Sequence, residues 1–268
     1  RQQVLATADR LRYQPHAAAR SLSSRRTQTI GVVLPDLYGE FFSELIRGID
    51  QVARARRQHL LVSSYHGLPE EQGEALRAMR GRVDGLLVLS PYTDQPGFLV
   101  DNLPSSLPVV LINTDVQDSP YPALTIDNYS AAVAMVEHLV QAGHRRIAFI
   151  GGPEGNFDAR ERLRGYRDAM ARFVPGTPPQ EFAGDFSESS GYEAGKRIAQ
   201  SAEKPQAVFA ANDMMALGCL YAFNEAGVRV PQDVALAGFD DIPLARFVHP
   251  TLTTMRVSIA ELGGQAMS

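Results

Sequence analysis

Cysteine and long apolar runs are nearly absent from this sequence of 268 residues. Cys219 is the only cysteine, which excludes an intrachain disulfide and a cysteine-based metal cage and fits a reducing compartment. No run of 18 apolar residues and no signal peptide is present, so neither membrane insertion nor secretion is expected. From these absences we predict a cytoplasmic protein without a membrane partner.

The motifs of common enzyme classes are missing too. The six histidines include no HExxH pair, and His138 and His144 are too far apart in sequence for one, so a metal site is not expected. The glycine-rich loop at residues 151–155 has neither the P-loop nor the dinucleotide spacing, and Glu154 would repel a phosphate. No G-x-S-x-G elbow and no evident pair of catalytic carboxylates occurs. We therefore predict neither an enzyme nor a bound cofactor.

Charge is unevenly distributed along the chain. The whole sequence has 26 basic and 30 acidic residues, a net charge of −4. The first 26 residues contain six arginines against one acid, Asp9, and so carry +5, which leaves −9 for the remainder. A basic arm on an acidic body is expected when only the arm meets DNA. Considered alone, the arm is also typical of a disordered, arginine-tipped tail.

Short apolar runs alternate with helical segments from Ile30 onward. A first series of strands is predicted at residues 30–34, 60–63, 85–90 and 108–113. The pattern restarts after Asp127, with strands at residues 147–150, 207–211 and 234–239. Parallel strands joined by helical crossovers form doubly wound sheets. We therefore predict an α/β fold with two similar doubly wound parallel-sheet subdomains around a cleft.

The stretch from 206 to 241 places polar side chains at the ends of two predicted strands. Asn212 and Asp213 follow the first strand, where Asp213 is the predicted cap of the next helix, and Asp240 and Asp241 follow the second. In open α/β sheets, ligands bind at this carboxyl edge of the strands. From the pattern alone, Asn212 fits equally well as a turn residue and Asp240 as a loop acid.

Two strings are specific enough to suggest a family, FAANDMMALGCL and VPQDVALAGFDDIPLARFVHPTLTT. They resemble the lactose-repressor/galactose-repressor (LacI/GalR) family of bacterial transcriptional regulators. The similarity continues, in the same order, through GVVLPDLYGEFFSELIRGID, RVDGLLVLS, PVVLIN, HLVQAGHRRIAFIGGP and RERLRGYRDAM, and so covers nearly the whole chain. It implies the two-lobed architecture of type I periplasmic sugar-binding proteins.

The resemblance also implies a division of the chain. Residues 1–26 would be the remnant of a DNA-binding headpiece and its hinge helix. The effector-binding core, 27–268, would consist of a first subdomain at 27–127 plus 256–268 and a second subdomain at 128–255. The chain would cross between the lobes near Asp127, near Asp241 and after Thr254.

A ligand site in the cleft is a further implication of the resemblance. Arg162 and Asp240 would face each other there, and a guanidinium opposite a carboxylate can hold the vicinal hydroxyl groups of a sugar. Phe41 and Phe186 match positions that contact the apolar face of the ligand, although from the pattern alone both fit better as core residues. The dipeptide Gly-Glu at 39–40 departs from the family's asparagine–proline pair, so this wall of the pocket is expected to differ. The ligand-binding residues carried over from the family are Phe41, Asn113, Asp158, Arg162, Phe186, Asn212 and Asp240.

The same resemblance implies that the basic arm binds DNA. The helix predicted at Ala17–Ser23 corresponds to the hinge helix, and Leu22 to the leucine that wedges into the minor groove beside its dimer mate. The DNA-binding positions are His16, Ala19 and Leu22, of which His16 departs from the usual asparagine. The family's recognition helix would lie just before Arg1, and a further segment would follow Ser268.

These observations predict a DNA-binding transcriptional regulator, specifically a repressor. Its core is expected to bind a small effector, a sugar or sugar derivative, and to couple that binding to operator affinity in a homodimer. The alternative is a periplasmic-type sugar-binding receptor of the same fold without DNA binding. The basic arm with Leu22 favours the regulator, because such a receptor has no use for a hinge helix.

Overall fold

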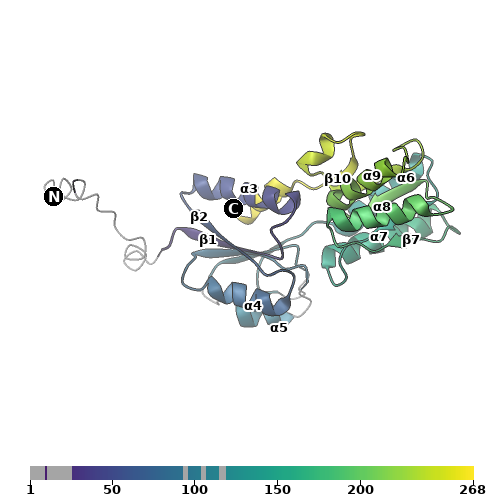
Figure 1. The fold of residues 1–268 in the computed structure, drawn as a ribbon. Helices are drawn as coiled ribbons and strands as arrows, with labels where there is room; N and C mark the ends of the chain where they lie inside the picture. Colours follow the sequence, from purple (N-terminus) through teal and green to yellow (C-terminus); the bar gives the residue numbers. More distant parts are fainter. Residues whose placement is uncertain (1–9, 11–25, 93–95, 104–106, 115–118) are drawn as a thin grey trace.

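The computed structural model describes Arg10 and residues 26–92, 96–103, 107–114 and 119–268. These residues form two lobes that lie end to end, and the chain enters the first lobe from its far end (Figure 1). The helix predicted at Ala17–Ser23, with His16, Ala19 and Leu22, lies outside the described residues. Its DNA-binding role therefore stays a prediction.

The first lobe is built on a parallel sheet with the strand order β2-β1-β3-β4-β5. Its strands are β1 (Thr29–Leu34), β2 (His59–Ser64), β3 (Gly85–Leu89), β4 (Val109–Ile112) and β5 (Ala123–Leu124). Its helices are α3 (Glu40–Ala55), α4 (Pro69–Ala78), α5 (Pro96–Asn102) and α10 (Ile259–Ala266). Successive side chains of β1 point to opposite faces: Val32 packs in the cluster with α3 and α10, and Val33 in the cluster with α4 and α5. Helices therefore cover both faces of the sheet.

The second lobe repeats this arrangement with the strand order β10-β9-β8-β6-β7, again all parallel. Its strands are β6 (Ile147–Ile150), β7 (Gln180–Phe182), β8 (Ala207–Ala210), β9 (Ala235–Asp240) and β10 (Thr253–Arg256). Its helices are α6 (Asn128–Gln141), α7 (Phe157–Phe173), α8 (Glu188–Gln200), α9 (Asp213–Glu225) and the short 3-10 helix η1 (Pro243–Arg246). All residues of β6, β8 and β9 are buried, as expected for parallel strands covered on both faces. The predicted pair of doubly wound subdomains is confirmed.

The chain crosses between the lobes after β5 and again after β10. The crossing predicted near Asp241 is wrong, because β9 and β10, on either side of this loop, pair in the same sheet. The apolar residues Ile242 and Ala245 around η1 nevertheless belong to the core cluster of the first lobe. This loop therefore contacts both lobes without changing sheets.

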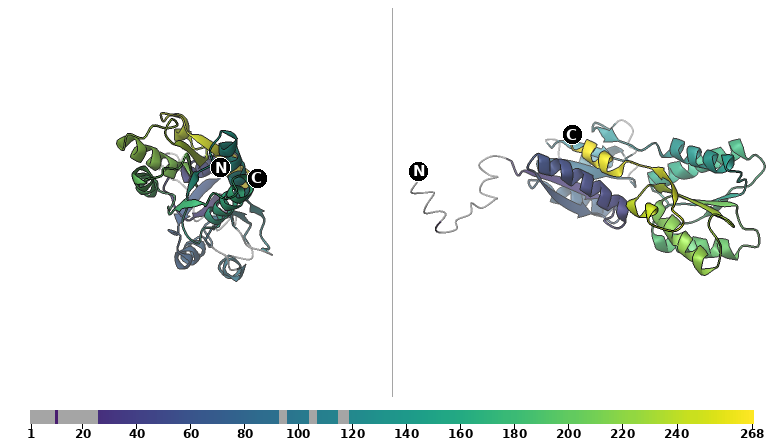
Figure 2. Two further views of the ribbon diagram at one scale, coloured as in Figure 1. Left: turned by 90° about the vertical axis from the view of Figure 1, so that its right-hand side faces the viewer. Right: turned by 90° about the horizontal axis from the view of Figure 1, so that it is seen from above.

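Helix α10 follows the second lobe in sequence but packs against α3 in the first lobe (Figure 2). The two helices approach closely at Gly48, where an added Cβ atom would lie 1.9 Å from the carbonyl oxygen of Ala260. A side chain at position 48 would push the helices apart. The glycine thus fixes where the C-terminal helix docks.

Asp213 does not cap α9, contrary to the sequence-based expectation. The cap is Asn212, whose Oδ1 accepts a hydrogen bond from the Met215 amide at 2.9 Å. The Asp213 carboxylate instead accepts bonds from the amide of Ile242 and the hydroxyl of Thr254, at 2.9 and 2.6 Å. It therefore joins α9 to the loop after β9 and to β10.

Candidate functional site

A cavity of about 400 Å³ lies between the lobes and is lined by residues of both. Among the residues carried over from the family, Phe41, Asp158, Arg162, Phe186, Asn212 and Asp240 line this cavity. Asn113 is not among the lining residues, but it reaches the site through a hydrogen bond from its Nδ2 to Asp158 Oδ2 at 3.4 Å. The structure thus brings the whole predicted set together at one place.

Arg162 is held in the floor of the cavity by its own lobe. Its Nε donates to Asn128 Oδ1 at 2.8 Å, and its Nη1 donates to the carbonyl oxygen of Ala211 at 2.6 Å. Its guanidinium lies over the ring of Phe239, 3.7 Å from the ring centre, and 5.8 Å from the ring centre of Phe186. The side chain is buried, so its orientation is set before any ligand arrives.

Asp240 lies beside this arginine with one oxygen atom unsatisfied. Its Oδ1 is 3.3 Å from Arg162 Nη1, which is ion-pair distance, yet it accepts no hydrogen bond within the described part of the chain. The residue is only 4% exposed, so water cannot solvate it as it would a surface carboxylate. Burial raises the pKa of Asp240 to about 7, against the opposing effect of Arg162 and with a contribution from Asp158.

Asp158 is the second buried acid of the cavity. Its Oδ1 accepts a hydrogen bond from Asn128 Nδ2 at 2.7 Å, and its Oδ2 accepts the bond from Asn113. Burial raises its pKa to about 6, while Arg162 and the two amides act in the opposite direction. Two buried carboxylates therefore share one guanidinium, and the negative charge of the site is incompletely balanced.

Asn128 joins these groups, although the sequence analysis did not single it out. It is the first residue of α6 and bonds to both Arg162 and Asp158. Its position immediately after Asp127, where the chain was predicted to enter the second lobe, was the available signal. Because α6 begins where the chain passes from the first lobe to the second, its first residue lies at the boundary between the lobes.

Aromatic side chains also line the cavity. Tyr38, Phe41, Phe42 and Tyr92 line it from the first lobe, and Phe186 lines it from the second. Phe41 and Phe42 contact each other edge to face, with ring centres 5.5 Å apart. Phe41 and Phe186 also pack against the core of their own lobes. Each of them therefore both lines the cavity and contributes to a core, as the two interpretations of the sequence separately expected.

Direct contacts bridge the lobes around the cavity. Asn113 ends β4 of the first lobe and bonds to Asp158 of the second. The amide of Phe157 donates to the carbonyl oxygen of Pro91 at 2.8 Å. At the entrance, the Tyr38 hydroxyl donates to Glu188 Oε2 at 2.8 Å. Each of these contacts depends on the relative position of the two lobes.

Three residues of the predicted ligand-binding set have strained backbone, as do Gln28, Arg57, His66 and Asp241 elsewhere in the described chain. Asn113, Phe186 and Asp240 have φ angles of 45°, 72° and 111°, in the left-handed region that residues with a side chain rarely adopt. Such conformations cost on the order of 1–3 kcal/mol each and persist where the surrounding structure enforces them. All three belong to the predicted ligand-binding set, which supports a functional reason for the strain.

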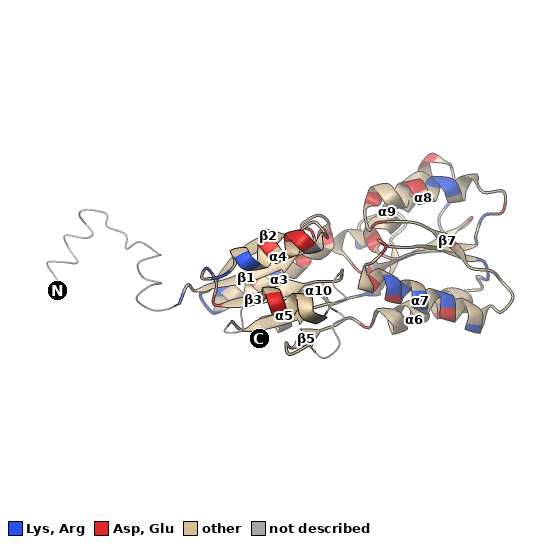
Figure 3. Cartoon of the chain, turned by 90° about the horizontal axis from the view of Figure 1, so that it is seen from below, with Lys and Arg blue, Asp and Glu red and all other residues tan. Residues whose placement is uncertain are grey.

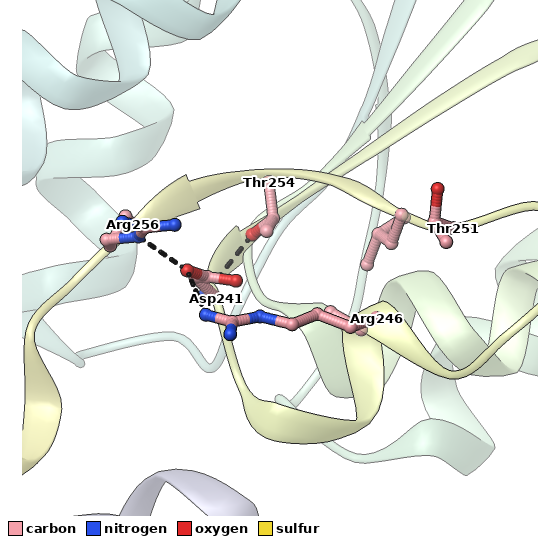
Figure 4. Close-up of a pocket in the computed structure, with 7 residues that line it drawn as sticks. Asp241, Arg246, Thr251, Thr254 and Arg256 are labelled. Carbon is pink, nitrogen blue, oxygen red and sulfur yellow. Dashed lines mark hydrogen bonds and ion pairs between the residues drawn. The ribbon is translucent and has the colours of Figure 1, made fainter.

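A second, open pocket of about 590 Å³ lies at the loop after β9 (Figure 4). Asp241 lies at its centre and accepts hydrogen bonds from Arg246 at 3.2 Å and Arg256 at 2.6 Å. Its amide also donates to the Thr254 hydroxyl. Because its carboxylate is already paired, Asp241 contrasts with its neighbour Asp240, which turns toward the cavity between the lobes.

The described residues offer neither a metal cluster nor a membrane-spanning helix. They contain no group of three histidine, cysteine, aspartate or glutamate side chains placed to hold a metal ion. None of their helices is both long enough and apolar enough to cross a membrane.

Comparisons with known proteins place this geometry in a family. A model described as "Periplasmic binding protein-like domain" matches residues 136–268. Catabolite control protein A of Priestia megaterium is 34% identical over 273 residues, which cover 100% of this chain and 81% of that protein. The chain belongs to the LacI family of transcriptional regulators.

Further LacI-family proteins are similar over nearly the same length. The ribose operon repressor of Escherichia coli K12 is 36% identical, covering 98% of this chain and 81% of that protein. The solved lac repressor bound to ONPG in its repressed state superimposes with a TM-score of 0.87 at 28% identity, covering 99% of this chain and 81% of the other. A LacI-family regulator from Lactobacillus casei with bound sucrose gives a TM-score of 0.81 at 27% identity, covering 89% of each chain. The predicted transcriptional-regulator function with an effector-binding core is confirmed at the level of the family.

Proposed function

We propose that the cavity between the lobes binds a sugar or sugar derivative as the effector of this regulator. One observation carries the proposal: Asp240 Oδ1 is buried beside Arg162 and lacks a hydrogen-bond donor among the described residues. A hydroxyl group of a ligand would supply that donor. A buried acceptor left unsatisfied costs about 1–3 kcal/mol, so a ligand that satisfies it gains specificity as well as affinity.

Arg162 complements Asp240 as a donor. Its Nε and one N–H of its Nη1 donate within the lobe, whereas its Nη2 makes no hydrogen bond to the described residues. A vicinal diol can donate to Asp240 and accept from Arg162 at the same time, because the two groups are adjacent and fixed. The aromatic residues above them suit the apolar face of a pyranose or furanose ring. The relative from Lactobacillus casei that was solved with sucrose supports this class of ligand.

The lobes would transmit the ligand's presence to DNA. A ligand that contacts both lobes stabilises one relative orientation of them. The segment before β1 is attached to the first lobe through Asp84, which accepts bonds from the amides of Thr27 and Gln28 at 2.7 and 2.8 Å. The preceding arm, with His16, Ala19 and Leu22, would carry the DNA contacts. Operator affinity would then depend on lobe orientation.

A homodimer would present two such arms to a near-palindromic operator. Tyr221, Leu244 and Phe247 of the second lobe are exposed apolar side chains, and Phe247 is 77% exposed. Exposed apolar surface of this kind supports association with a second copy of the chain.

A thermal-shift screen tests the ligand assignment. Wild type is melted with a panel of pentoses, hexoses and their glycosides, and a true ligand raises the melting temperature because it binds only the folded chain. The shift should be lost in Asp240→Asn, while Asp241→Asn, which alters the neighbouring paired carboxylate, should retain it. A panel in which no sugar stabilises wild type, or in which both variants respond like wild type, contradicts the proposal.

A further inference from the structure

Four exposed arginines gather at one edge of the first lobe. Because the strands run parallel, the start of β1 lies beside the starts of β2 and β3, with Thr29 paired to His59 and Ile30 paired to Gly85. The connections that lead into these strands therefore meet at the amino edge of the sheet. We name this group the basic edge; it consists of Arg56, Arg57, Arg80 and Arg82.

The arginines of the basic edge differ from most others in their partners. Arg56 and Arg80 donate to the carbonyl oxygens of Met267 and Asn102, which are neutral groups. Arg56, Arg57, Arg80 and Arg82 form no ion pair with a carboxylate of the described residues. Elsewhere in the described chain, arginines such as Arg167 and Arg229 are paired with acids, whereas Arg145, Arg172 and Arg197 are not, so the distinguishing feature of this edge is that four such arginines enter neighbouring strands of one sheet. The positive charge of this edge is therefore left for an external partner.

The single acid in these three connections is used internally. Asp84 accepts bonds from the amides of Thr27 and Gln28 and from the Thr27 hydroxyl at 2.9 Å. These bonds fix the point at which the N-terminal arm joins the first lobe. The basic edge therefore surrounds the attachment of an arm that itself carries six arginines, in a molecule whose remainder has a net charge of −9. In Figure 3, blue ribbon, which marks lysine and arginine, lies at the end of the first lobe where β1 begins.

We propose that the basic edge contacts the phosphate backbone of DNA next to the segment bound by the arm. Arginine binds phosphate oxygens with a planar pair of N–H groups, and such contacts add affinity without reading sequence. An acidic body repels DNA, so unpaired positive charge is useful only where the body comes within a Debye length, about 8–10 Å, of the duplex. The edge at which the arm begins is that place. The inference rests on the proposed DNA-binding role of the arm.

The test removes two arginines and measures the salt dependence of DNA binding. Full-length Arg57→Gln/Arg82→Gln is titrated with a fluorescent duplex of about 40 base pairs and arbitrary sequence, at about 50 to 200 mM KCl. Neutralised phosphates release counterions, so the slope of log K against log salt should become less negative by about one to two. The lysine variant Arg57→Lys/Arg82→Lys should keep most of the wild-type slope.

A matched control separates local contacts from net charge. Arg172→Gln/Arg197→Gln removes two exposed arginines from the second lobe and changes the total charge equally. Its slope should equal that of wild type. If both glutamine pairs change the slope alike, or if Arg57→Gln/Arg82→Gln matches wild type, the basic edge does not contact DNA. If wild type itself binds the duplex without salt dependence or not at all, the proposed DNA-binding role fails, and this inference fails with it.

Discussion

Arg162 and Asp240 lie 3.3 Å apart in the floor of the cleft, yet no hydrogen bond joins them. One of the two N–H groups on Arg162 Nη1 donates to the carbonyl oxygen of Ala211 at 2.6 Å, and none makes a hydrogen bond to Asp240 Oδ1, which therefore has a neighbouring charge without an aligned donor. The pair is therefore positioned but incomplete. Under the proposed function, a ligand hydroxyl would complete it, and the predictions for Asp240 depend on this relationship.

Replacing Asp240 by asparagine should weaken binding of the effector found in the sugar screen by about 2 kcal/mol, roughly thirtyfold. The amide keeps the shape of the side chain but loses the charged acceptor. Isothermal titration calorimetry measures the change. Asp241→Asn is the matched control, because Asp241 is paired with Arg246 and Arg256 and does not line the cavity. Unchanged affinity in Asp240→Asn would remove this carboxylate from the ligand site.

Effector affinity should increase with pH between about 6 and 8. Burial raises the pKa of Asp240 to about 7, so a ligand hydroxyl competes with a proton for this carboxylate in the lower part of the range. The affinity at pH 6 should be about tenfold lower than at pH 8. Titrations in two buffers of different ionisation enthalpy should show release of a proton on binding. An affinity that is flat over this range would argue against an ionised Asp240 as the acceptor.

The stability of the empty protein should change in the opposite direction. Burial raises the pKa values of Asp158, Asp240 and Asp213 to about 6, 7 and 8. The folded chain thus holds these protons more tightly than the unfolded chain, in which an aspartate titrates near about 4. The free energy of unfolding should therefore decrease from about pH 4 to about pH 8 and stay low above it.

Urea denaturation across this range checks the sign. Asp213→Asn/Asp240→Asn should lose most of the decrease, because the neutral amides have no proton to release. Acids with a lowered pKa, such as Asp233 at about 2, respond only at lower pH and do not mask the effect. If the free energy of unfolding instead rises between about pH 5 and about pH 8, the raised pKa values of these three aspartates are contradicted.

Removing the Tyr38 hydroxyl should speed release of the effector. Tyr38→Phe deletes the bond to Glu188 that connects the lobes at the entrance of the cavity. The dissociation rate should rise by about two- to fivefold, as expected for one exposed hydrogen bond, with little change in stability. Tyr192→Phe is the control, because its 2.7 Å bond to Glu225 lies within the second lobe. Equal rates in wild type and Tyr38→Phe, measured by stopped flow, would show that this contact does not retain the ligand.

Introducing a charge at Phe247 should shift the protein toward monomer. Phe247 is 77% exposed in the single chain, and burial of such a ring in an interface contributes about 1.5–3 kcal/mol. Sedimentation velocity of Phe247→Glu at several concentrations measures the shift. Val100→Glu places the same charge on an exposed apolar position of α5 and should sediment like wild type. A Phe247→Glu protein that remains dimeric would place the interface elsewhere.

Much of the fold could be predicted from the sequence because its signals are local. The apolar run AVFA forms the fully buried strand β8, and the alternation of such runs with amphipathic helices requires parallel, doubly wound sheets. The short elements β5, β7 and α5 escaped prediction because two to seven residues carry too little periodicity. The crossing at Asp241 was wrongly placed because strand pairing between β9 and β10 is a non-local property.

The sequence by itself determined that polar side chains stand where buried strands end, and its resemblance to the family named the predicted site residues. Asn212, Asp240 and their neighbours follow buried strands, and parallel sheets bring such strand ends to one edge whatever their separation along the chain. Only the tertiary structure decided how these groups are used. Asn212 is the cap that Asp213 was expected to be, Asp213 holds the loop after β9, and Asn128 links Arg162 to Asp158. The unsatisfied oxygen of Asp240 likewise depends on Ala211, Arg162 and the burial provided by both lobes. Which donor pairs with which acceptor here depends on distances between elements that are far apart in sequence. A local sequence pattern therefore cannot predict these hydrogen bonds.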